Sequence, residues 1–297
     1  MNRMNGTRRE FITAATAFAA VGSAFGGTDG EGGLKVRFLG TGAADWKGID
    51  ERGEYRRNAS VLVEGKVLID YTSSSADMLP KDARPETIFY THSHGDHYQP
   101  ESMLKLGSVR RVYVSESWVA AAKREIAAAA DRLGVAAPEV SGLAFTQSVT
   151  VDGVRFTSLP ANHFTGRPGE HCSMYLVEKG ASRLLYATDT SGIPVETAAF
   201  IGIDTDNVKP RPITGLVMEA TMGVSYADNF RIFTHSSVAT VAQIARVLET
   251  TGCYRPRHGQ KIWLTHIART LHGTHREIAA TAPAPLAPAY DGQEVVF

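Results

Sequence analysis

The sequence predicts an α/β protein in which two packed β-sheets are covered by helices on their outer sides. Two observations lead to this expectation. Short β-branched and aromatic runs come first in hairpins and then alternate with helical runs, and this order occurs twice along the chain. Hydrophobic residues make up 43% of the 297 residues, as is usual for a globular protein with a substantial core.

The first of these two series of strands and helices contains turn signals that delimit its strands and its helix. Glu64 and Gly65 divide one apolar run into two strands, and a polar, glycine-rich loop separates this pair from the first strand. An alanine-rich run begins after Ser115 and ends before Gly134, as a capped helix does. The expected elements are a strand over residues 34–40, two strands within 60–71, a strand over 86–91 and a helix over 116–133.

The second series begins with two hairpins. Asp152 with Gly153 and Lys179 with Gly180 are the turn pairs, and Gly252 ends an amphipathic helical run. The proline- and alanine-rich residues 282–289 predict an extended connector. The expected elements are strands within 148–160 and 172–190, a strand over 212–220, a helix over 236–251, a strand over 261–266, a short helix over 274–280 and a terminal strand over 293–297.

The first thirty residues have the pattern of an export signal. Arg8 and Arg9 precede a run without charge from residue 11 to residue 27, which is too short to span a bilayer reliably. The stretch TRREFI resembles a twin-arginine signal; the alternative is a chance arginine pair before a tail. We therefore expect a signal peptide and linker over residues 1–30, a single domain over 31–297, the twin-arginine machinery as export partner, and a periplasmic or secreted protein without a membrane span after signal removal.

Charge and cysteine content exclude several classes of protein. The 31 basic and 31 acidic residues cancel, which argues against stable binding of nucleic acid. Cys172 and Cys253 are too few for a disulfide framework or a cysteine-rich zinc site, and buried apolar positions suit them better. The sequence leaves open whether they pair, and it leaves open whether the protein forms a homodimer.

The stretch FYTHSHGDHYQP, residues 89–100, is the strongest chemical signal. If the chain stays extended after the buried strand, His92 and His94 point the same way. Gly95 lets the backbone turn, so that Asp96 and His97 can face a second point nearby. An isolated histidine is usually a surface or core residue, but three imidazoles and a carboxylate together are the mixed nitrogen and oxygen set that zinc favours.

Three later residues have the same place relative to a strand. His163, Asp189 and His266 each follow the end of a predicted strand, where loops gather around a site. The shared position predicts that they complete the metal site.

These residues resemble the metal ligands of the metallo-β-lactamase superfamily. The stretch THSHGDH is similar to its metal-binding signature, and the later residues match its further ligands in order. The resemblance covers most of residues 34–297 and implies a four-layer αβ/βα sandwich of the metallo-β-lactamase type. It also implies two divalent ions, most simply zinc, with manganese and iron as alternatives. By this likeness one ion is held by His92, His94 and His163, the second by Asp96, His97 and His266, and Asp189 bridges them.

Later stretches resemble the phosphodiesterase branch of the superfamily, which includes PhnP and tRNase Z. They are FLGTGAA, RRNAS, YATDTSGIP, MEATMG, FTHSS, LTHIA and AYDG. The sequence departs from that branch in two respects: it has no cysteine cluster for an additional structural zinc, and no long inserted arm of the kind that grips tRNA.

The resemblance implies hydrolysis of a phosphodiester. Two close divalent ions lower the pKa of a shared water, and the resulting hydroxide attacks phosphorus. We expect catalytic roles for Asp96, for His235 as the general acid and for Glu219 as the group that orients it. The alternatives are a residue beside the helix cap for His235 and a strand-end charge for Glu219. Arg57, Asn58, Arg167 and His171 are the expected substrate-binding residues; for Arg56 and Arg57, a solvated charge is the alternative.

The sequence thus predicts an exported binuclear metal hydrolase for a small cyclic phosphate or nucleotide. Two other functions stay open at this point. One is hydrolysis of carboxylic esters or lactones on the same scaffold, and the other is metal-dependent binding without catalysis.

Overall fold

The structure is a computed structural model that describes residues 32–204, 207–257 and 259–297. The predicted signal over residues 1–30 and the histidine at position 258 lie outside the described residues. Among the described residues, no helix has both the length and the apolar character needed to cross a lipid bilayer.

The first sheet contains the strands of the first series and the last strand of the chain. Its order is β16-β1-β2-β3-β4-β5-β6, antiparallel from β16 to β3 and parallel from β3 to β6. The C-terminal strand therefore returns to pair with the first strand of the domain. The bounds are β1 Lys35–Gly40, β2 Ser60–Val63, β3 Val67–Ile69, β4 Thr87–Phe89, β5 Arg111–Ser115, β6 Glu139–Leu143 and β16 Glu294–Val296.

The second sheet repeats this arrangement. Its order is β15-β14-β13-β10-β9-β8-β7, antiparallel in the hairpins and parallel from β10 to β15. A small separate hairpin joins β11 Ile203–Asp204 to β12 Asn207–Val208. The bounds are β7 Ser148–Val151, β8 Val154–Pro160, β9 Ser173–Lys179, β10 Ser182–Ala187, β13 Gly215–Glu219, β14 Ile262–Thr265 and β15 Leu286–Pro288.

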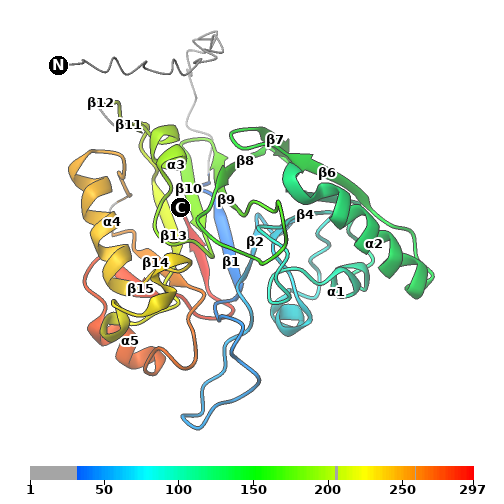
Figure 1. Ribbon diagram of the computed structural model, residues 1–297, viewed down its shortest axis with the longest axis horizontal. Helices are drawn as coiled ribbons and strands as arrows, with labels where there is room; N and C mark the ends of the chain where they lie inside the picture. Colours follow the sequence, from blue (N-terminus) through cyan, green and yellow to red (C-terminus); the bar gives the residue numbers. More distant parts are fainter. Residues whose placement is uncertain (1–31, 205–206, 258) are drawn as a thin grey trace, which may run out of the picture. The chain divides into compact units, whose positions relative to one another are not determined.

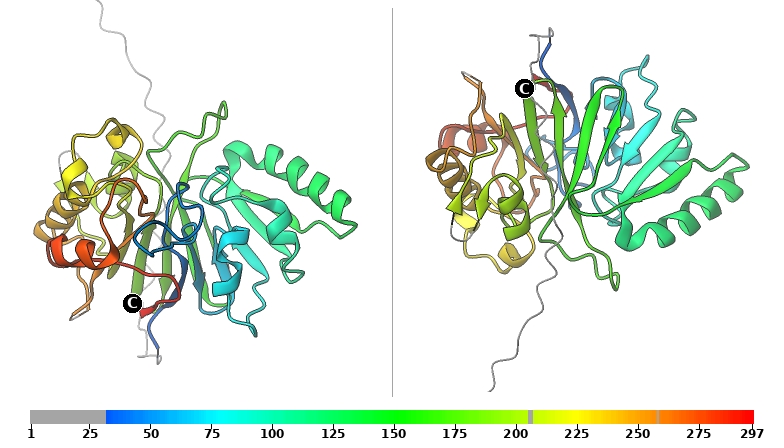
Figure 2. Two further views of the ribbon diagram at one scale, coloured as in Figure 1. Left: turned by 90° about the horizontal axis from the view of Figure 1, so that it is seen from below. Right: turned by 90° about the horizontal axis from the view of Figure 1, so that it is seen from above.

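The helices lie outside the two sheets, so that the domain has four layers. Figures 1 and 2 show α1 and α2 beyond the first sheet and α3, α4 and α5 beyond the second. Three apolar clusters correspond to the three interfaces between these layers. The bounds are α1 Pro100–Leu104, α2 Val119–Leu133, α3 Val195–Phe200, α4 Val238–Thr250 and α5 His275–Thr281, with 3₁₀ turns η1 Ser73–Met78, η2 Glu116–Trp118, η3 Val224–Tyr226 and η4 Phe230–Phe233.

The architecture confirms the predicted fold of two helix-covered sheets. The interface between the sheets is formed by rings and branched side chains from both, and Phe89 stacks on Phe156 of the opposite sheet with 4.4 Å between ring centroids. The last residue, Phe297, is fully buried in the same cluster. The two sheets therefore share one core.

The structure corrects one element and adds others. The expected connector over residues 282–289 contains strand β15, which pairs with β14 at the edge of the second sheet. An edge position tolerates proline because one side of the strand needs no donors. Strands β5 and β6 and helices α1 and α3 were not predicted, since their runs are short and lack clear turn signals. Cys172 and Cys253 are buried, free thiols.

Candidate metal centre

The site lies where several strands of both sheets end. The loop after β4 carries His92, His94, Asp96 and His97, and His163 follows β8. Asp189 follows β10 and His266 follows β14 by one residue. The structure thus brings together all seven side chains that the sequence predicts as ligands. Their donor atoms form overlapping groups of three, each within 4.8 Å, among them His92–His94–His163 and Asp96–His97–His266.

A tight turn after the first two histidines brings His97 back to the site. The amides of His97 and Tyr98 both donate to the carbonyl oxygen of His94, at 3.0 and 2.8 Å. The Gln99 side chain donates to the Gly95 carbonyl across the same turn at 2.8 Å. These bonds fix the loop that the sequence suggested from Gly95 alone.

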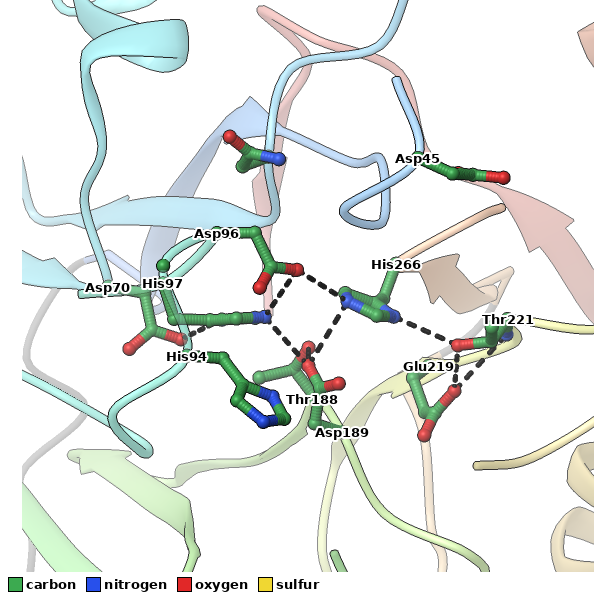
Figure 3. Close-up of polar contacts among 12 residues, drawn as sticks. Asp45, Asp70, His94, Asp96, His97, Thr188, Asp189, Glu219, Thr221 and His266 are labelled. Atoms are coloured by element: carbon green, nitrogen blue, oxygen red, sulfur yellow. Dashed lines mark hydrogen bonds and ion pairs between the residues drawn. The ribbon is translucent and has the colours of Figure 1, made fainter. Parts of the chain in front are cut away.

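Asp189 lies between the two groups of histidines. Its Oδ1 is 3.8 Å from His163 Nε2, whereas its Oδ2 is 2.8 Å from His97 Nε2 and 3.3 Å from His266 Nε2. Asp96 Oδ2 lies 3.4 Å from both His97 Nε2 and His266 Nε2. Figure 3 shows the side chains of Asp96, His97, Asp189 and His266 pointing toward one another. A carboxylate with one oxygen toward each group has the position needed to bridge two cations.

The buried imidazoles fit a metal ion. His92 and His97 are inaccessible to solvent, and the Nε2 atom of His92 has no hydrogen-bond partner. A buried polar atom without a partner is costly unless a ligand satisfies it. Burial lowers the pKa of His92 well below its usual value, and thus favours the neutral ring that binds metals.

The carboxylates among the histidines make a positive charge favourable at this site. Burial opposes the charged form of His97, but Asp189, Asp96 and Asp70 hold its pKa well above the usual value. The histidines in turn keep the pKa of Asp189 well below its usual value in spite of burial. Two carboxylates, Asp96 and Asp189, remain ionised among largely buried rings, which is the charge distribution that divalent cations neutralise.

Asp70 supports the site from behind, and the sequence analysis missed it. It is fully buried, accepts from the Thr91 amide and hydroxyl at 2.8 Å each, and accepts from His97 Nδ1 at 2.8 Å. A proton fixed on Nδ1 leaves Nε2 as the ligand atom. The signal was available, because Asp70 follows the end of strand β3 just as Asp189 and His266 follow theirs.

Three of these strand-end residues have left-handed backbones. The φ angles are 56° for Asp70, 46° for Asp189 and 52° for His266. Residues other than glycine rarely adopt this region, and such strain is found often at functional sites. The sharp turns direct the Asp189 and His266 side chains to the cavity and the Asp70 side chain to His97.

His235 and Glu219 lie beside the ligands as the sequence predicts. His235 Nδ1 is 3.0 Å from Glu219 Oε1 and 3.6 Å from Asp189 Oδ1. Burial disfavours the imidazolium, but the carboxylates of Glu219 and Asp189 outweigh it and raise the pKa of His235 to about 9. Thr221, which the sequence analysis also missed, hydrogen-bonds Glu219 and lies 2.9 Å from His266 Nδ1, so it links the pair to a ligand (Figure 3).

A cavity of about 280 Å³ opens onto this cluster. His94, Asp96, Asp189, His235 and His266 line one part of it, and Asp45, Thr221 and Arg231 line another. The described residues lining it include a single arginine, Arg231, which the sequence analysis did not select. Its position in an irregular 3₁₀ turn gives no periodic signal.

The four residues expected to bind substrate do not line this cavity. Arg57 is held by Asp77 and Asp291, and the Asn58 side chain accepts from the hydroxyls of Thr72 and Ser74. Arg167 pairs with Glu125 at 2.8 Å and Glu170 at 3.3 Å. His171 is exposed and its ring stacks near Phe145.

Arg56 is a correction to the alternative of a solvated charge. It is 5% exposed and donates to the Thr41 hydroxyl and the Ala289 carbonyl at 2.8 Å each. Its role in the structure is to tie the loop before β2 to the segment after β15.

Comparison with known proteins agrees with the fold. Residues 71–267 match the family model of the β-lactamase superfamily domain. A diphosphatase from the PhnP family superposes with a TM-score of 0.60 at 20% identity, over 89% of this chain and 98% of that chain. The short form of human tRNase Z gives 0.63 at 17% identity over 88% and 98%. Zn²⁺-bound PqqB from Methylobacterium extorquens gives 0.66 at 15% identity over 89% and 100%. No curated protein matches the sequence.

Proposed function

The chain belongs to the β-lactamase superfamily and has its metallo-hydrolase fold, and on that premise we propose that it is an exported phosphodiesterase for a small cyclic phosphate or nucleotide. The observation that carries the proposal is the pair of His235 and Glu219 beside the two groups of ligand side chains. A phosphodiester needs both a site for its charged oxygens and a proton donor for its leaving oxygen. PhnP-family diphosphatase and tRNase Z among the similar structures are consistent with this choice.

The predicted ligands fall into two groups, one for each cation. His92, His94 and His163 would hold one ion, and Asp96, His97 and His266 the other, with Asp189 between them. Two such ions, with zinc the simplest choice, would supply a nucleophilic water and would neutralise the oxygens of the phosphate. Asp70 and Thr221 keep the rings of His97 and His266 in place for this purpose.

His235 is the proposed general acid. Its Nδ1 is occupied by Glu219 at 3.0 Å, so Nε2 is the atom that carries a proton to the leaving oxygen. Burial disfavours the charged ring, but the Glu219 carboxylate beside Nδ1 raises its pKa and so favours the protonated form that an acid needs. Glu219 is fully buried and also accepts from the Thr190 amide at 2.7 Å, which fixes the orientation of the pair.

The test is His235→Ala assayed on linear and cyclic phosphodiesters, with metal content measured on the same preparations. We expect kcat to fall by about 10²- to 10⁴-fold while two metal equivalents remain bound. Added imidazole should restore part of the activity, because the gap left by the ring can admit it. Turnover of esters or lactones, but of no phosphodiester, by the wild-type protein would replace this proposal with an esterase on the same scaffold. Two bound metals without turnover of either class would indicate a binding protein.

Export is the part of the proposal that rests on residues 1–30 alone. Replacing both Arg8 and Arg9 by lysine should retain the protein in the cytoplasm, because twin-arginine export depends on this pair. Fractionation of cells that express the wild-type and the double-lysine chains measures the outcome. Equal distribution of the two chains would remove export from the proposal.

A further inference from the structure

The segment between β13 and α4 presents exposed phenylalanines next to the site. We call residues 224–234 the rim segment; it contains η3 and η4 and leads directly to His235. Phe230 and Phe233 on it are 72% and 78% exposed, and Phe164, which follows His163, is 71% exposed. Among the described residues these are the only exposed phenylalanines. All three lie within five residues of a histidine of the centre.

Hydrogen bonds hold the rim segment against the metal centre. The Ser191 hydroxyl donates to the Ile232 carbonyl, and His163 Nδ1 lies 3.0 Å from the Thr234 carbonyl oxygen. The rings of His163 and His235 are in contact, with 4.8 Å between centroids. Phe164 is the next residue after His163, and Phe233 lies two residues before His235, so both are close in sequence to histidines whose rings are in contact.

Arg231 adds a positive charge to the same mouth. It lines the cavity, and its guanidinium carbon lies 4.9 Å from the centroid of the Phe230 ring. No carboxylate of the described residues is within ion-pair distance of it. Asp45 lines the same cavity, but its oxygens accept from the Arg269 amide and from the amide and hydroxyl of Thr270. The charge of Arg231 is thus available to a ligand.

We propose that the rim segment is a specificity subsite, which recognises a phosphodiester carrying both an aromatic ring and a second anionic group. Arg231 binds the second anion, and Phe230, Phe233 and Phe164 contact the ring. A guanidinium gives charge-assisted hydrogen bonds to phosphate or carboxylate, and exposed aromatic side chains stack with a base or aryl group. This proposal rests on the proposed phosphodiesterase function and names the class of its substrate. Nucleotides with a phosphate beyond the scissile one belong to this class.

Four cyclic phosphates that share one reacting group test the subsite. They are methyl riboside 2′,3′-cyclic phosphate, adenosine 2′,3′-cyclic phosphate, and the 5′-phosphate of each. For the wild-type enzyme we expect the 5′-phosphate to lower KM about tenfold and the base to lower it about fivefold, with kcat little changed. Equal KM values for all four compounds would overturn the proposal.

Variants show which residues cause the effects of the 5′-phosphate and of the base on KM. Arg231→Gln should abolish the advantage of the 5′-phosphate, and Phe233→Ala should reduce the advantage of the base. These side chains are exposed, so their replacement leaves the core intact. Arg246→Gln on the exposed side of α4 and Tyr290→Ala, where the ring is 54% exposed, are the matched controls. The proposal fails if Arg231→Gln and Arg246→Gln give the same KM ratio.

Binding measurements separate failure of the subsite from failure of the proposed function. Calorimetry compares adenosine 3′-monophosphate with adenosine 3′,5′-bisphosphate on the metal-loaded wild-type and Arg231→Gln proteins. Tighter binding of the bisphosphate that depends on Arg231, without turnover of any cyclic phosphate, would retain the subsite and refute the phosphodiesterase. Turnover without any preference that depends on Arg231 would do the reverse.

Discussion

Asp70 determines which nitrogen of His97 faces the metal centre. Its Oδ2 accepts from His97 Nδ1 and its Oδ1 accepts from the Thr91 amide. In Asp70→Asn the amide oxygen keeps the Thr91 contact, and the NH₂ group then faces Nδ1. The proton of a neutral His97 must move to Nε2, which can no longer bind a metal.

We therefore expect Asp70→Asn to weaken binding of at least one metal ion by about 10- to 100-fold. Competition with a chromogenic chelator measures the dissociation constants. Asp77→Asn, where the side chain is 60% exposed and pairs with Arg57, is the control and should leave them unchanged. Equal affinities for both variants would contradict a role for Asp70 in orienting His97.

His272 gives the protein a dependence of stability on pH that is separate from the ligands. Its Nε2 donates to the Ala220 carbonyl at 2.6 Å, and burial, more than its neighbours, lowers its pKa from 6.5 to about 4. As the pH falls, His272 therefore takes up a proton near pH 6.5 in the unfolded chain, but only near pH 4 in the folded protein. The stabilisation is complete above pH 6.5 and is lost as the pH falls through this window.

His272→Gln should flatten this dependence, because glutamine can donate the same bond and does not titrate. Between pH 7 and pH 4.5 we expect the free energy of unfolding of the wild type to fall by about 2 kcal/mol more than that of the variant. Urea denaturation at several pH values measures the difference. Parallel curves for the two proteins would show that His272 titrates normally.

Single residues also show where sequence reasoning reached its limit. The ligand-type residues at strand ends could be selected because strand ends and residue chemistry are both visible in the sequence. Arg57 and Arg167 could not be judged, because one of the two carboxylates that hold each of them is distant in sequence: Asp291 lies 234 positions from Arg57, and Glu125 lies 42 positions from Arg167. Arg231 could not be found, because only the cavity singles it out among the arginines of the chain.

At the scale of elements, helices and hairpins with strong end signals were predicted well. The predicted end of the alanine-rich helix is confirmed: α2 ends at Leu133, and Gly134 has a left-handed backbone with φ of 66°. Strands without such signals, β5 and β6, could not be predicted. The edge strand β15 was predicted only as an extended connector, because proline content hides its pairing with β14.

The cap of α2 provides a test at this scale. A Cβ added at Gly134 meets no atom within 4 Å, so an alanine there would lose stability only through its left-handed backbone. Gly134→Ala should lower the free energy of unfolding by about 1 kcal/mol, and Gly134→Asn by less, because asparagine tolerates the left-handed region. Thermal or urea unfolding of the three proteins ranks them. An alanine variant as stable as the wild type would exclude this account of the cap.

At the scale of the whole molecule, the two sheets depend on the last residue of the chain. Phe297 is fully buried, and its ring lies so close to Gly215 that an added Cβ there would be 2.2 Å from Cδ1. Its amide and carbonyl both pair with Leu34, at 2.9 and 3.0 Å. The ring thus packs in the core shared by both sheets.

Phe297→Ala should lower the free energy of unfolding by about 3 to 5 kcal/mol, since it leaves a cavity in that core. Val296→Ala is the control, because the Val296 side chain is 50% exposed and its loss should cost less than about 0.5 kcal/mol. Equilibrium denaturation compares the two. Similar losses of unfolding free energy for both variants would contradict this role of Phe297, because they would mean that the core repacks and fills the space of the missing ring.

The centre is assembled from both halves of the chain. His92, His94, Asp96 and His97 precede the loop between β6 and β7, whereas His163, Asp189 and His266 follow it. A gene cut in that loop would yield two fragments with incomplete donor sets, and the second fragment would carry strand β16 of the first sheet. Cations held by donors from both fragments would strengthen the association of the co-expressed fragments beyond what the shared core provides. The pair would then act as a split reporter of the metal supply.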